Sequence, residues 1–189
     1  MPPCNPDDCT DCIAGKYGYL NSGTADCKDC DTGKYKDQAG QPSNTCITCP
    51  ANSGVMATGS DAVDDCLALA GYTGQGSSVP ACVAGKYKAS SAPSAAACTD
   101  CAASKYKAES TQTSDTCVDC PANSDVLTTG SDAEDDCEGV AGYSGKGSAA
   151  TAAVCTAGQY KATVASSAAC IDCEAGKWAT TPSAAVQCT

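Results

Sequence analysis

Cys30-Asp-Thr-Gly-Lys-Tyr35 is the stretch that decides the fold, because related copies of it recur along the whole chain. Each copy begins with a cysteine and places an aromatic residue five positions later. The other five copies are Cys12-Ile-Ala-Gly-Lys-Tyr17, Cys82-Val-Ala-Gly-Lys-Tyr87, Cys101-Ala-Ala-Ser-Lys-Tyr106, Cys155-Thr-Ala-Gly-Gln-Tyr160 and Cys173-Glu-Ala-Gly-Lys-Trp178. Ten cysteines, including these six, follow one another at intervals of 16 to 19 residues. The basic structural unit is therefore about 18 residues long.

A longer repeat is superimposed on the short one, with a period of 71 to 73 residues. It aligns Cys27 with Cys98, and 13 of 17 positions are identical between residues 50–66 and 121–137. Duplication explains this similarity. The predicted segments are an N-terminal extension at 1–11, a six-cysteine repeat at 12–81, a second six-cysteine repeat at 82–154 and a partial third repeat at 155–189.

The composition leaves too little apolar material for an ordinary core. Among 189 residues, isoleucine, leucine and valine together number 17, phenylalanine is absent and the formal net charge is -11. Hydrophobic burial alone does not fold a chain of this kind. The 18 cysteines, an even number, predict a disulfide framework instead. Such a framework persists in an oxidising compartment, so we expect an extracellular or cell-surface location.

Pairing each cysteine with its nearest neighbour across one unit accounts for every cysteine. The eight repeat loops then enclose 14 to 16 residues each, the uniformity expected of a repeated module. The predicted disulfides are Cys12–Cys27, Cys30–Cys46, Cys49–Cys66, Cys82–Cys98, Cys101–Cys117, Cys120–Cys137, Cys155–Cys170 and Cys173–Cys188, with Cys4–Cys9 left together. Loop entropy assigns about 3 kcal/mol to each closure. Crossed pairing within a six-cysteine set stays open, because sequence alone does not determine connectivity.

Two other cysteine chemistries compete with disulfides. The spacing Cys27-x2-Cys30-x15-Cys46-x2-Cys49, repeated at 98–120, satisfies that of a zinc ribbon, but it leaves ten cysteines without a comparable partner set. A thioredoxin-like redox motif needs one Cys-x-x-Cys pair at a helix start, whereas this chain has six such pairs in loop-rich sequence. The disulfide interpretation is preferred, and no metal and no cofactor is predicted.

Eight of the nine aromatic residues stand at a fixed distance from a cysteine. The offset is five residues in six units and six residues after Cys66 and Cys137, and Tyr19 alone departs from the rule. The repeat aromatics are Tyr17, Tyr35, Tyr72, Tyr87, Tyr106, Tyr143, Tyr160 and Trp178. We expect these rings to lie against the disulfides and the neighbouring unit. A carbohydrate-stacking ladder is the functional alternative.

The predicted fold class is a small disulfide-rich repeat protein, an elongated rod of cystine modules with short β-hairpins and little helix. Alanine-rich stretches at 94–97, 149–153 and 165–169 are too short and too poorly capped for helices. The Asp-Asp-Cys segments predict one short helical turn each, with Ser60 and Ser131 as candidate caps. Residues 67–81 and 138–154 lie between sequential disulfides, where we expect irregular loops or bends.

Several segments imitate functional sites. Two acidic clusters offer oxygen ligands for calcium but lack a known loop spacing, so a solvated acidic face is favoured. The clusters are Asp61, Asp64 and Asp65, and Asp132, Glu134, Asp135 and Asp136.

Segments 71–77 and 142–148 resemble phosphate-binding loops, but neither follows a convincing strand nor opens a helix. Histidine is absent, which removes the usual hydrolase triad, and we expect no enzymatic activity.

The charge pattern disfavours several partners. All 11 basic residues are lysine and 22 carboxylates outnumber them, so nucleic acid and anionic lipid are unfavourable partners. No apolar run approaches the roughly 20 residues of a membrane helix, and the N-terminus lacks an apolar signal stretch, which suggests a mature or trimmed chain. A membrane anchor would lie outside this chain. No Asn-x-Ser/Thr sequon occurs, but the loops rich in serine and threonine are compatible with O-linked glycans.

The order of the cysteines resembles a known family. The pattern Cys-x14-Cys-x2-Cys-x15-Cys-x2-Cys-x16-Cys at 12–66, repeated with a fifteen-residue first spacing at 82–137 and begun again at 155, is similar to that of the surface immobilisation antigens of ciliates. This resemblance implies a glycolipid-anchored coat protein built from six-cysteine repeats. Short Cys-x-x-Cys repeats also occur in protozoan variable surface proteins and in receptor ectodomains similar to the ephrin and tumour-necrosis-factor receptors.

We therefore expect a non-enzymatic extracellular structural protein, a cell-surface coat or filament component. An adhesion or receptor-like binding ectodomain on the same scaffold is the alternative. The unfinished repeat at 155–189 leaves an uncovered face, which makes copies of the chain candidate head-to-tail partners. If the missing part belongs to the same longer polypeptide, the isolated chain stays monomeric.

Overall fold

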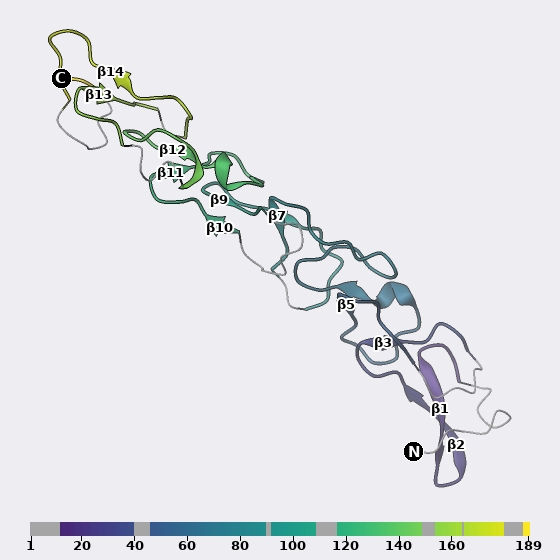
Figure 1. Ribbon diagram of the computed structural model, residues 1–189. Coiled ribbons are helices and arrows are strands. Elements are labelled where there is room, and N and C mark those ends of the chain that lie inside the picture. Colours follow the sequence, from purple (N-terminus) through teal and green to yellow (C-terminus); the bar gives the residue numbers. More distant parts are fainter. Residues whose placement is uncertain are drawn as a thin grey trace. The chain divides into compact units, whose positions relative to one another are not determined.

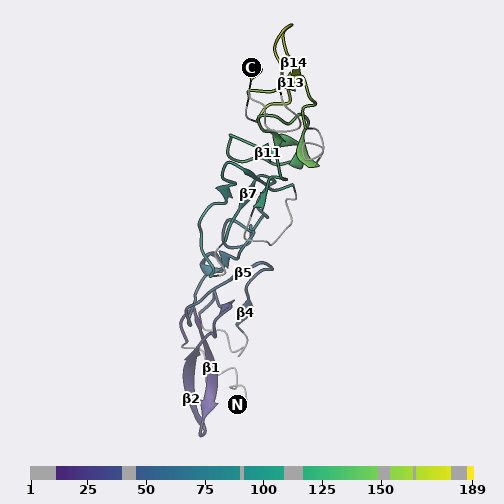
Figure 2. The ribbon, with the colours of Figure 1, turned by 90° about the vertical axis from the view of Figure 1, so that its left-hand side faces the viewer.

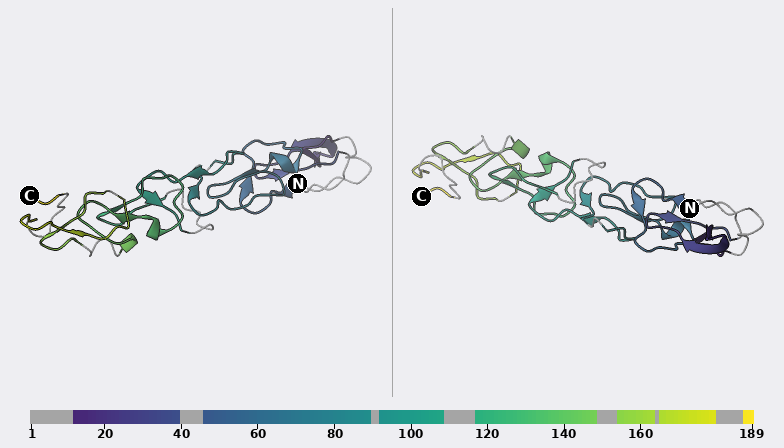
Figure 3. Two further views of the ribbon diagram at one scale, coloured as in Figure 1. Left: turned by 90° about the horizontal axis from the view of Figure 1, so that it is seen from above. Right: turned by 90° about the horizontal axis from the view of Figure 1, so that it is seen from below.

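The computed structural model describes residues 12–39, 46–89, 92–108, 117–148, 154–163, 165–179 and 187–189. The chain forms two compact units. The first consists of Met1–Cys82 and Lys88–Cys98, and the second of Val83–Tyr87 and Thr99–Thr189. Both units are built from short strands separated by long loops (Figures 1 and 3).

The first unit contains three antiparallel hairpins and one 3₁₀ turn. The hairpins pair β1 (Lys16–Asn21) with β2 (Thr24–Asp29), β3 (Lys34–Tyr35) with β4 (Ile47–Thr48) and β5 (Ser53–Gly54) with β6 (Leu67–Ala68), and the turn η1 spans Val63–Asp65. The β1–β2 ribbon is the longest of the described hairpins (Figure 2). Its connection is two residues long, with φ of 51° at Ser22 and 88° at Gly23. Positive φ at both positions matches the twist of a tight hairpin.

The second unit repeats this plan with four antiparallel hairpins. They pair β7 (Lys86–Tyr87) with β8 (Thr99–Asp100), β9 (Lys105–Tyr106) with β10 (Val118–Asp119), β11 (Ser124–Asp125) with β12 (Glu138–Gly139) and β13 (Gln159–Tyr160) with β14 (Ile171–Asp172). The 3₁₀ turn η2 spans Glu134–Asp136. No α-helix occurs among the described residues of either unit, and none of them form a helix long and apolar enough to cross a membrane.

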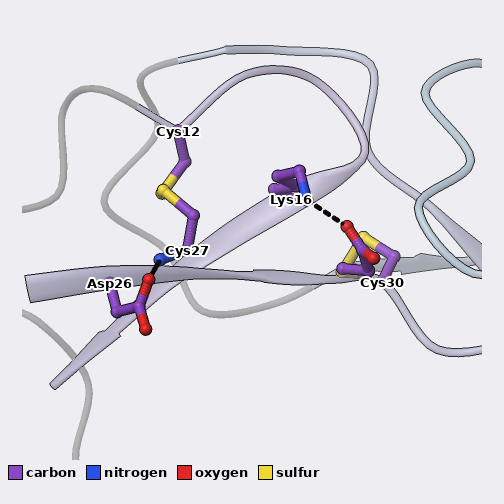
Figure 4. A network of polar contacts seen from close by, with 7 residues as sticks. Cys12, Lys16, Asp26, Cys27 and Cys30 are labelled. Carbon is purple, nitrogen blue, oxygen red and sulfur yellow. Dashed lines mark hydrogen bonds and ion pairs between the residues drawn. A yellow bond between two sulfur atoms is a disulfide. The ribbon is translucent and has the colours of Figure 1, made fainter. Parts of the chain in front are cut away.

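The repeated sequence explains the two-residue hairpins. The Lys-Tyr strand pairs with the two residues enclosed by a Cys-x-x-Cys pair, so that Tyr106 stands opposite Val118 and Lys105 opposite Asp119. On one face of the sheet, the aromatic residue stands opposite a residue of the partner strand. That residue is β-branched in four of the five hairpins of this kind, and an aromatic residue opposite a β-branched one is a favourable cross-strand pair. On the other face the ammonium group of Lys105 contacts the carboxylate of Asp119. The equivalent Lys16 Nζ lies 2.5 Å from Asp29 Oδ1, next to Cys30 (Figure 4).

The structure contains eight disulfides among the described cysteines, and none of those cysteines is free. The bonds join Cys12–Cys27, Cys30–Cys46, Cys49–Cys66, Cys82–Cys98, Cys101–Cys117, Cys120–Cys137, Cys155–Cys170 and Cys173–Cys188. These are the eight repeat disulfides predicted by pairing each cysteine with its nearest neighbour across one unit. The four cysteines of each predicted zinc-ribbon spacing are divided among different disulfides and are not grouped around one site. The predicted Cys4–Cys9 bond lies outside the described residues.

The disulfides also form most of the core. Among the described residues, the buried apolar positions are eight half-cystines together with Ala68 and Val126. The predicted fold class, a disulfide-rich repeat protein of short hairpins, is confirmed by this arrangement, whereas the elongated rod stays a prediction. A cystine core cannot supply the apolar area of an ordinary domain, so backbone contacts between modules carry more of the structure.

A repeated backbone hydrogen bond joins successive modules within each unit. The residue three positions after the opening cysteine donates its N–H to the carbonyl that lies six positions after the next opening cysteine. In the first unit these bonds are Gly15 to Lys36 at 2.8 Å and Gly33 to Val55 at 2.9 Å. In the second unit they are Gly85 to Lys107, Ser104 to Val126 and Gly158 to Ala179. The modules therefore interlock through their main chains, independently of side-chain type.

Glycine is required where this contact is closest. Gly15 has a φ of 80°, and a Cβ atom placed on it would lie 2.2 Å from the carbonyl oxygen of Gly59. Gly85 has a φ of 75° and would meet the Gly130 oxygen at the same distance. No side chain fits at either position. The Ala-Gly-Lys-Tyr motif therefore encodes both the turn and the close approach of the module two places further along the chain.

The repeat aromatics are less buried than expected. The seven tyrosines of the set are half-buried, and Trp178 is 59% exposed. Tyr106 lies at the edge of its module, and its hydroxyl donates to Glu134 Oε2 at 3.4 Å. Burial, together with this carboxylate, raises the pKa of Tyr106. The rings thus cover the hairpins from one side and do not form a closed core.

Loop segments follow the expectation where they are described. Residues 94–97 and 166–169 have no regular secondary structure, and 149–153 lie outside the described residues. Residues 67–81 form a compact irregular loop, closed by isolated bridges between Leu67 and Gln75 and between Tyr72 and Ala81. The described part of 138–154 has the same bridges at Glu138 with Lys146 and at Tyr143 with Val154.

Differences in burial predict the order in which the disulfides are reduced. Neither cysteine of Cys173–Cys188 is buried, whereas both cysteines of Cys49–Cys66 are. Exchange requires access of the attacking group to sulfur, so a limiting phosphine reductant should open Cys173–Cys188 several-fold faster. Alkylation of the freed thiols followed by peptide mass spectrometry measures both rates. Equal rates, or faster loss of Cys49–Cys66, would contradict the burial pattern.

Candidate functional site

Four lysines are buried at one repeated position, which the sequence pattern did not reveal. They are Lys36, Lys88, Lys107 and Lys161, each directly after the aromatic of its module and six residues after its opening cysteine. Lys107 and Lys161 are only 1% exposed. Lysine is almost never buried to this extent without partners. The signal was present in the sequence as the recurring dipeptide Tyr-Lys, but the lysine was not distinguished from an ordinary surface residue.

The ammonium groups of Lys88 and Lys161 bind carbonyl oxygens of their own and neighbouring modules. Lys161 Nζ donates to Gly139 O at 2.6 Å, Tyr143 O at 2.7 Å and Ser166 O at 2.5 Å. Three donors thus meet three acceptors, which uses the full capacity of the group. In the first unit, Lys88 Nζ donates to Ala68 O at 2.9 Å and Ser94 O at 2.6 Å.

We define a lysine socket as one of these buried ammonium groups together with its carbonyl partners. The sockets supply hydrogen-bond donors to carbonyl groups of loops that have few regular hydrogen bonds. Burial lowers the pKa of Lys36, Lys88, Lys107 and Lys161. Carbonyl oxygens that accept hydrogen bonds from a lysine stabilise its charged ammonium form, and they therefore oppose the lowering of its pKa. Among the described residues, every buried side-chain nitrogen and oxygen has a hydrogen-bond partner. We assign the sockets a structural role, because their donors are consumed by the protein itself.

The acidic clusters also serve local structure. Asp65 Oδ2 accepts the backbone N–H groups of Asp61 and Ala62 at 3.1 and 3.2 Å, and Asp136 Oδ2 does the same for Asp132 and Ala133 at 3.0 and 3.1 Å. The expected caps Ser60 and Ser131 are therefore wrong. The N-terminal caps of the 3₁₀ turns are Ala62 and Ala133, and a carboxylate from the third residue of each turn satisfies the backbone.

Ser60 and Ser131 have a different position from the one expected. Both are buried, and each forms an isolated parallel bridge with a repeat aromatic, Tyr35 for Ser60 and Tyr106 for Ser131. The backbone N–H of Lys36 donates to Ser60 O, and that of Lys107 donates to Ser131 O, both at 3.1 Å. These serines therefore lie in the contact between one module and the next.

The glycine-rich segments wrap around the acidic turns. Gly76 N–H donates to Cys66 O at 2.8 Å, and a Cβ atom on Gly76 would lie 2.3 Å from Asp64 Oδ1. In the second unit, Ser148 N–H donates to Glu134 Oε1 at 2.6 Å. The segments that resemble phosphate loops thus pack against carboxylates, an unfavourable setting for phosphate.

The weak calcium candidates do not converge. Within the described parts of the chain, no three carboxylates are gathered in a way that could hold a metal ion. The residues Asp61, Asp64, Asp65, Asp132, Glu134, Asp135 and Asp136 instead lie along the two 3₁₀ turns and the residues before them. Three of their carboxylates, those of Asp65, Glu134 and Asp136, already accept backbone N–H groups.

Each unit carries an equivalent surface hollow beside its acidic turn. The first hollow, of about 580 Å³, is lined by Val55–Ser60 together with Asp64, Asp65, Leu67 and Pro93. The second hollow, of about 480 Å³, is lined by Val126–Asp132 together with Asp135, Asp136, Glu138, Lys146 and Ala165. The two hollows occupy matching positions of the long sequence repeat. Their recurrence makes them the leading candidate for a functional surface on this chain.

An exposed apolar side chain stands at the same place in each hollow. Met56 is 68% exposed and Leu127 is 65% exposed, seven residues after Cys49 and Cys120 respectively. Carboxylates line both hollows, and the lysine of the second hollow, Lys146, lies 3.6 Å from Glu138 in an ion pair. An exposed apolar side chain next to carboxylates offers both apolar and electrostatic contacts to a binding partner.

Comparison with known proteins supports a cysteine-rich ectodomain module. Residues 15–66 match the family model described as tyrosine-protein kinase ephrin type A/B receptor-like. The match covers the hairpins β1–β2 and β3–β4 and ends at Cys66, which closes the third disulfide. Over this segment the chain is similar to a cysteine-rich repeat of an extracellular receptor type. No curated protein matches the chain.

Replacing a socket lysine tests the structural role of the sockets. Lys161→Met should destabilise the region around Gly139 and Ser166 by about 2–3 kcal/mol, because three carbonyl oxygens at this buried side chain lose the hydrogen bond from its ammonium group. Lys177→Met is the matched control: Lys177 is exposed, and its ion pair with Glu174 contributes less than about 0.5 kcal/mol. Amide hydrogen exchange followed by mass spectrometry measures both changes. Equal protection around Gly139 in the two variants would contradict the socket.

Proposed function

We propose that the protein is a non-enzymatic extracellular structural protein, a component of a cell-surface coat or extracellular filament. The observation that carries this proposal is the repeated interlock of disulfide-closed modules. In each unit the same backbone hydrogen bond recurs between successive modules, and disulfides close all the described modules except those at 67–81 and 138–154. A scaffold of this kind resists proteolysis and stretching without depending on a large apolar core.

The extracellular location is supported from two sides. Eight disulfides of uniform spacing are typical of proteins from oxidising compartments. The match of residues 15–66 to an ephrin-receptor-like family points to the same environment. The cysteine order adds its similarity to the surface immobilisation antigens of ciliates, which favours a coat, with a glycolipid anchor and O-linked glycans as parts of this proposal. Head-to-tail association of copies also stays a prediction.

A receptor-like or adhesive ectodomain is the second candidate. It is favoured by the family match and by the exposed Met56 and Leu127 in the two hollows. A coat protein needs only repeated surfaces without a specific binding face, and it covers the cell as an abundant layer. A receptor needs at least one specific binding face and is present in smaller amounts. The two functions therefore predict different abundance and distribution of the protein on the cell.

Immunogold electron microscopy of unpermeabilised source cells tests the proposal. A coat component should label the whole surface as a continuous layer, and native protein denatured without reductant should show no free thiols. Labelling confined to sparse clusters would favour the receptor-like alternative. Labelling only after permeabilisation, or a majority of free thiols, would overturn an extracellular function of either kind.

A further inference from the structure

We infer that the two hollows are docking sites for cationic, extended segments of another protein, in which an apolar side chain is flanked by lysine or arginine. The inference goes beyond the coat function and does not rest on it. A coat without this binding would remain a coat, and a binding protein without a coat function would still use the hollows.

The apolar part of the inference rests on Met56 and Leu127. Water contacts about two thirds of each side chain, and both stand at the same repeat position beside a hollow. In the first hollow, Leu67 and Pro93 add further apolar surface to the lining. The other exposed large apolar residues belong to different positions, such as Ile47, Val118 and Ile171 on the hairpins. A recess with an exposed apolar rim gains affinity when an apolar side chain fills it.

The size of the hollows limits what can fill them. Volumes of about 480 and 580 Å³ suit a few side chains of an extended segment, within the range of ordinary binding sites. The walls are main-chain turns closed by disulfides: Cys49–Cys66 flanks the first hollow and Cys120–Cys137 the second. The hollows are therefore preformed, which reduces the entropic cost of binding.

The charges that line the hollows determine which charge their occupant should carry. Among the described residues, the first hollow is lined by Asp64 and Asp65 and by no lysine, and the second by four carboxylates and by Lys146. Lys146 is paired with Glu138. A positively charged segment is attracted to this field, and its apolar residue meets Met56 or Leu127. A second copy of this chain would bring a net charge of -11 toward carboxylates and is disfavoured.

The two hollows differ in their lining, so we expect them to prefer different features of the peptide that binds. Leu67 of the first hollow is replaced by Glu138 at the matching position of the second. The first hollow should therefore depend more on the apolar side chain of the occupant, and the second more on its positive charge. One peptide probe should bind both sites with different salt dependence.

Nuclear magnetic resonance titration of the ¹⁵N-labelled full chain tests the inference. The probe is an acetylated pentapeptide of alternating lysine and leucine; one control peptide has serine for leucine, and the other has glutamate for lysine. The probe should shift the amide signals of residues 55–60 and 126–131 saturably and weaken at high salt. Both control peptides should bind at least about fivefold more weakly.

Matched variants separate the two hollows. Met56→Ser should weaken binding at the first hollow about fivefold and leave the second unchanged, and Leu127→Ser should do the reverse. The controls Ile13→Ser and Val83→Ser remove equally exposed side chains outside the hollows and should have no effect. Asp64→Asn and Asp135→Asn should weaken binding and reduce its salt dependence, in contrast to Asp31→Asn and Glu174→Gln.

Several outcomes would overturn the inference. Equal binding of the serine control peptide would show diffuse electrostatic attraction only, and equal binding of the glutamate control would show that charge does not select the occupant. Shifts spread over the whole surface, or no saturable shifts at millimolar probe, would show that the hollows are not sites. Self-association of the chain that masks residues 55–60 or 126–131 would identify a second copy as the occupant.

Discussion

The disulfides that close the hairpin modules are the interaction on which the rest of the structure depends. Folding must offset a conformational entropy of about 1–2 kcal/mol for every ordered residue, and this chain has little apolar area with which to do so. Closing a loop of about 15 residues removes much of that entropy from the unfolded chain in advance. The half-cystines also occupy most buried apolar positions, so one bond supplies both the constraint and the core.

A chain closed in this way still has to satisfy its loop carbonyls, and the lysine sockets do this. Two-residue strands provide few ladder hydrogen bonds, so loop carbonyl groups such as those of Tyr143 and Ser166 need donors from elsewhere in the chain. Lys161 brings three N–H donors to them on one flexible side chain. A buried charge is costly unless its hydrogen bonds are complete, which explains why three acceptors surround this one. A polar cluster thus replaces part of the apolar core.

How far the sequence predicts this structure depends on the spacing of its residues. Cysteine spacing identifies the module, the pairs such as Cys101–Cys117 and the short hairpins, because loop length and turn residues are local properties. The sockets escape such reasoning, since Lys107 differs from the exposed Lys105 only in the direction of its side chain. The same holds for Ser60, which lies in a contact between modules and does not cap a turn. Hollows are also invisible in the sequence, because residues 55–60 and Pro93 meet only after folding.

The heat-capacity change of unfolding tests most directly the claim that cystines and polar sockets replace an apolar core. Differential scanning calorimetry of the disulfide-intact protein provides the value. Globular domains give about 12–15 cal/mol/K per residue, and the increase comes from newly exposed apolar surface. The structure predicts roughly half of that range or less, because the described core contains two apolar residues besides cystine. A value within the ordinary range would contradict the account and would show that a substantial apolar core is lost on unfolding.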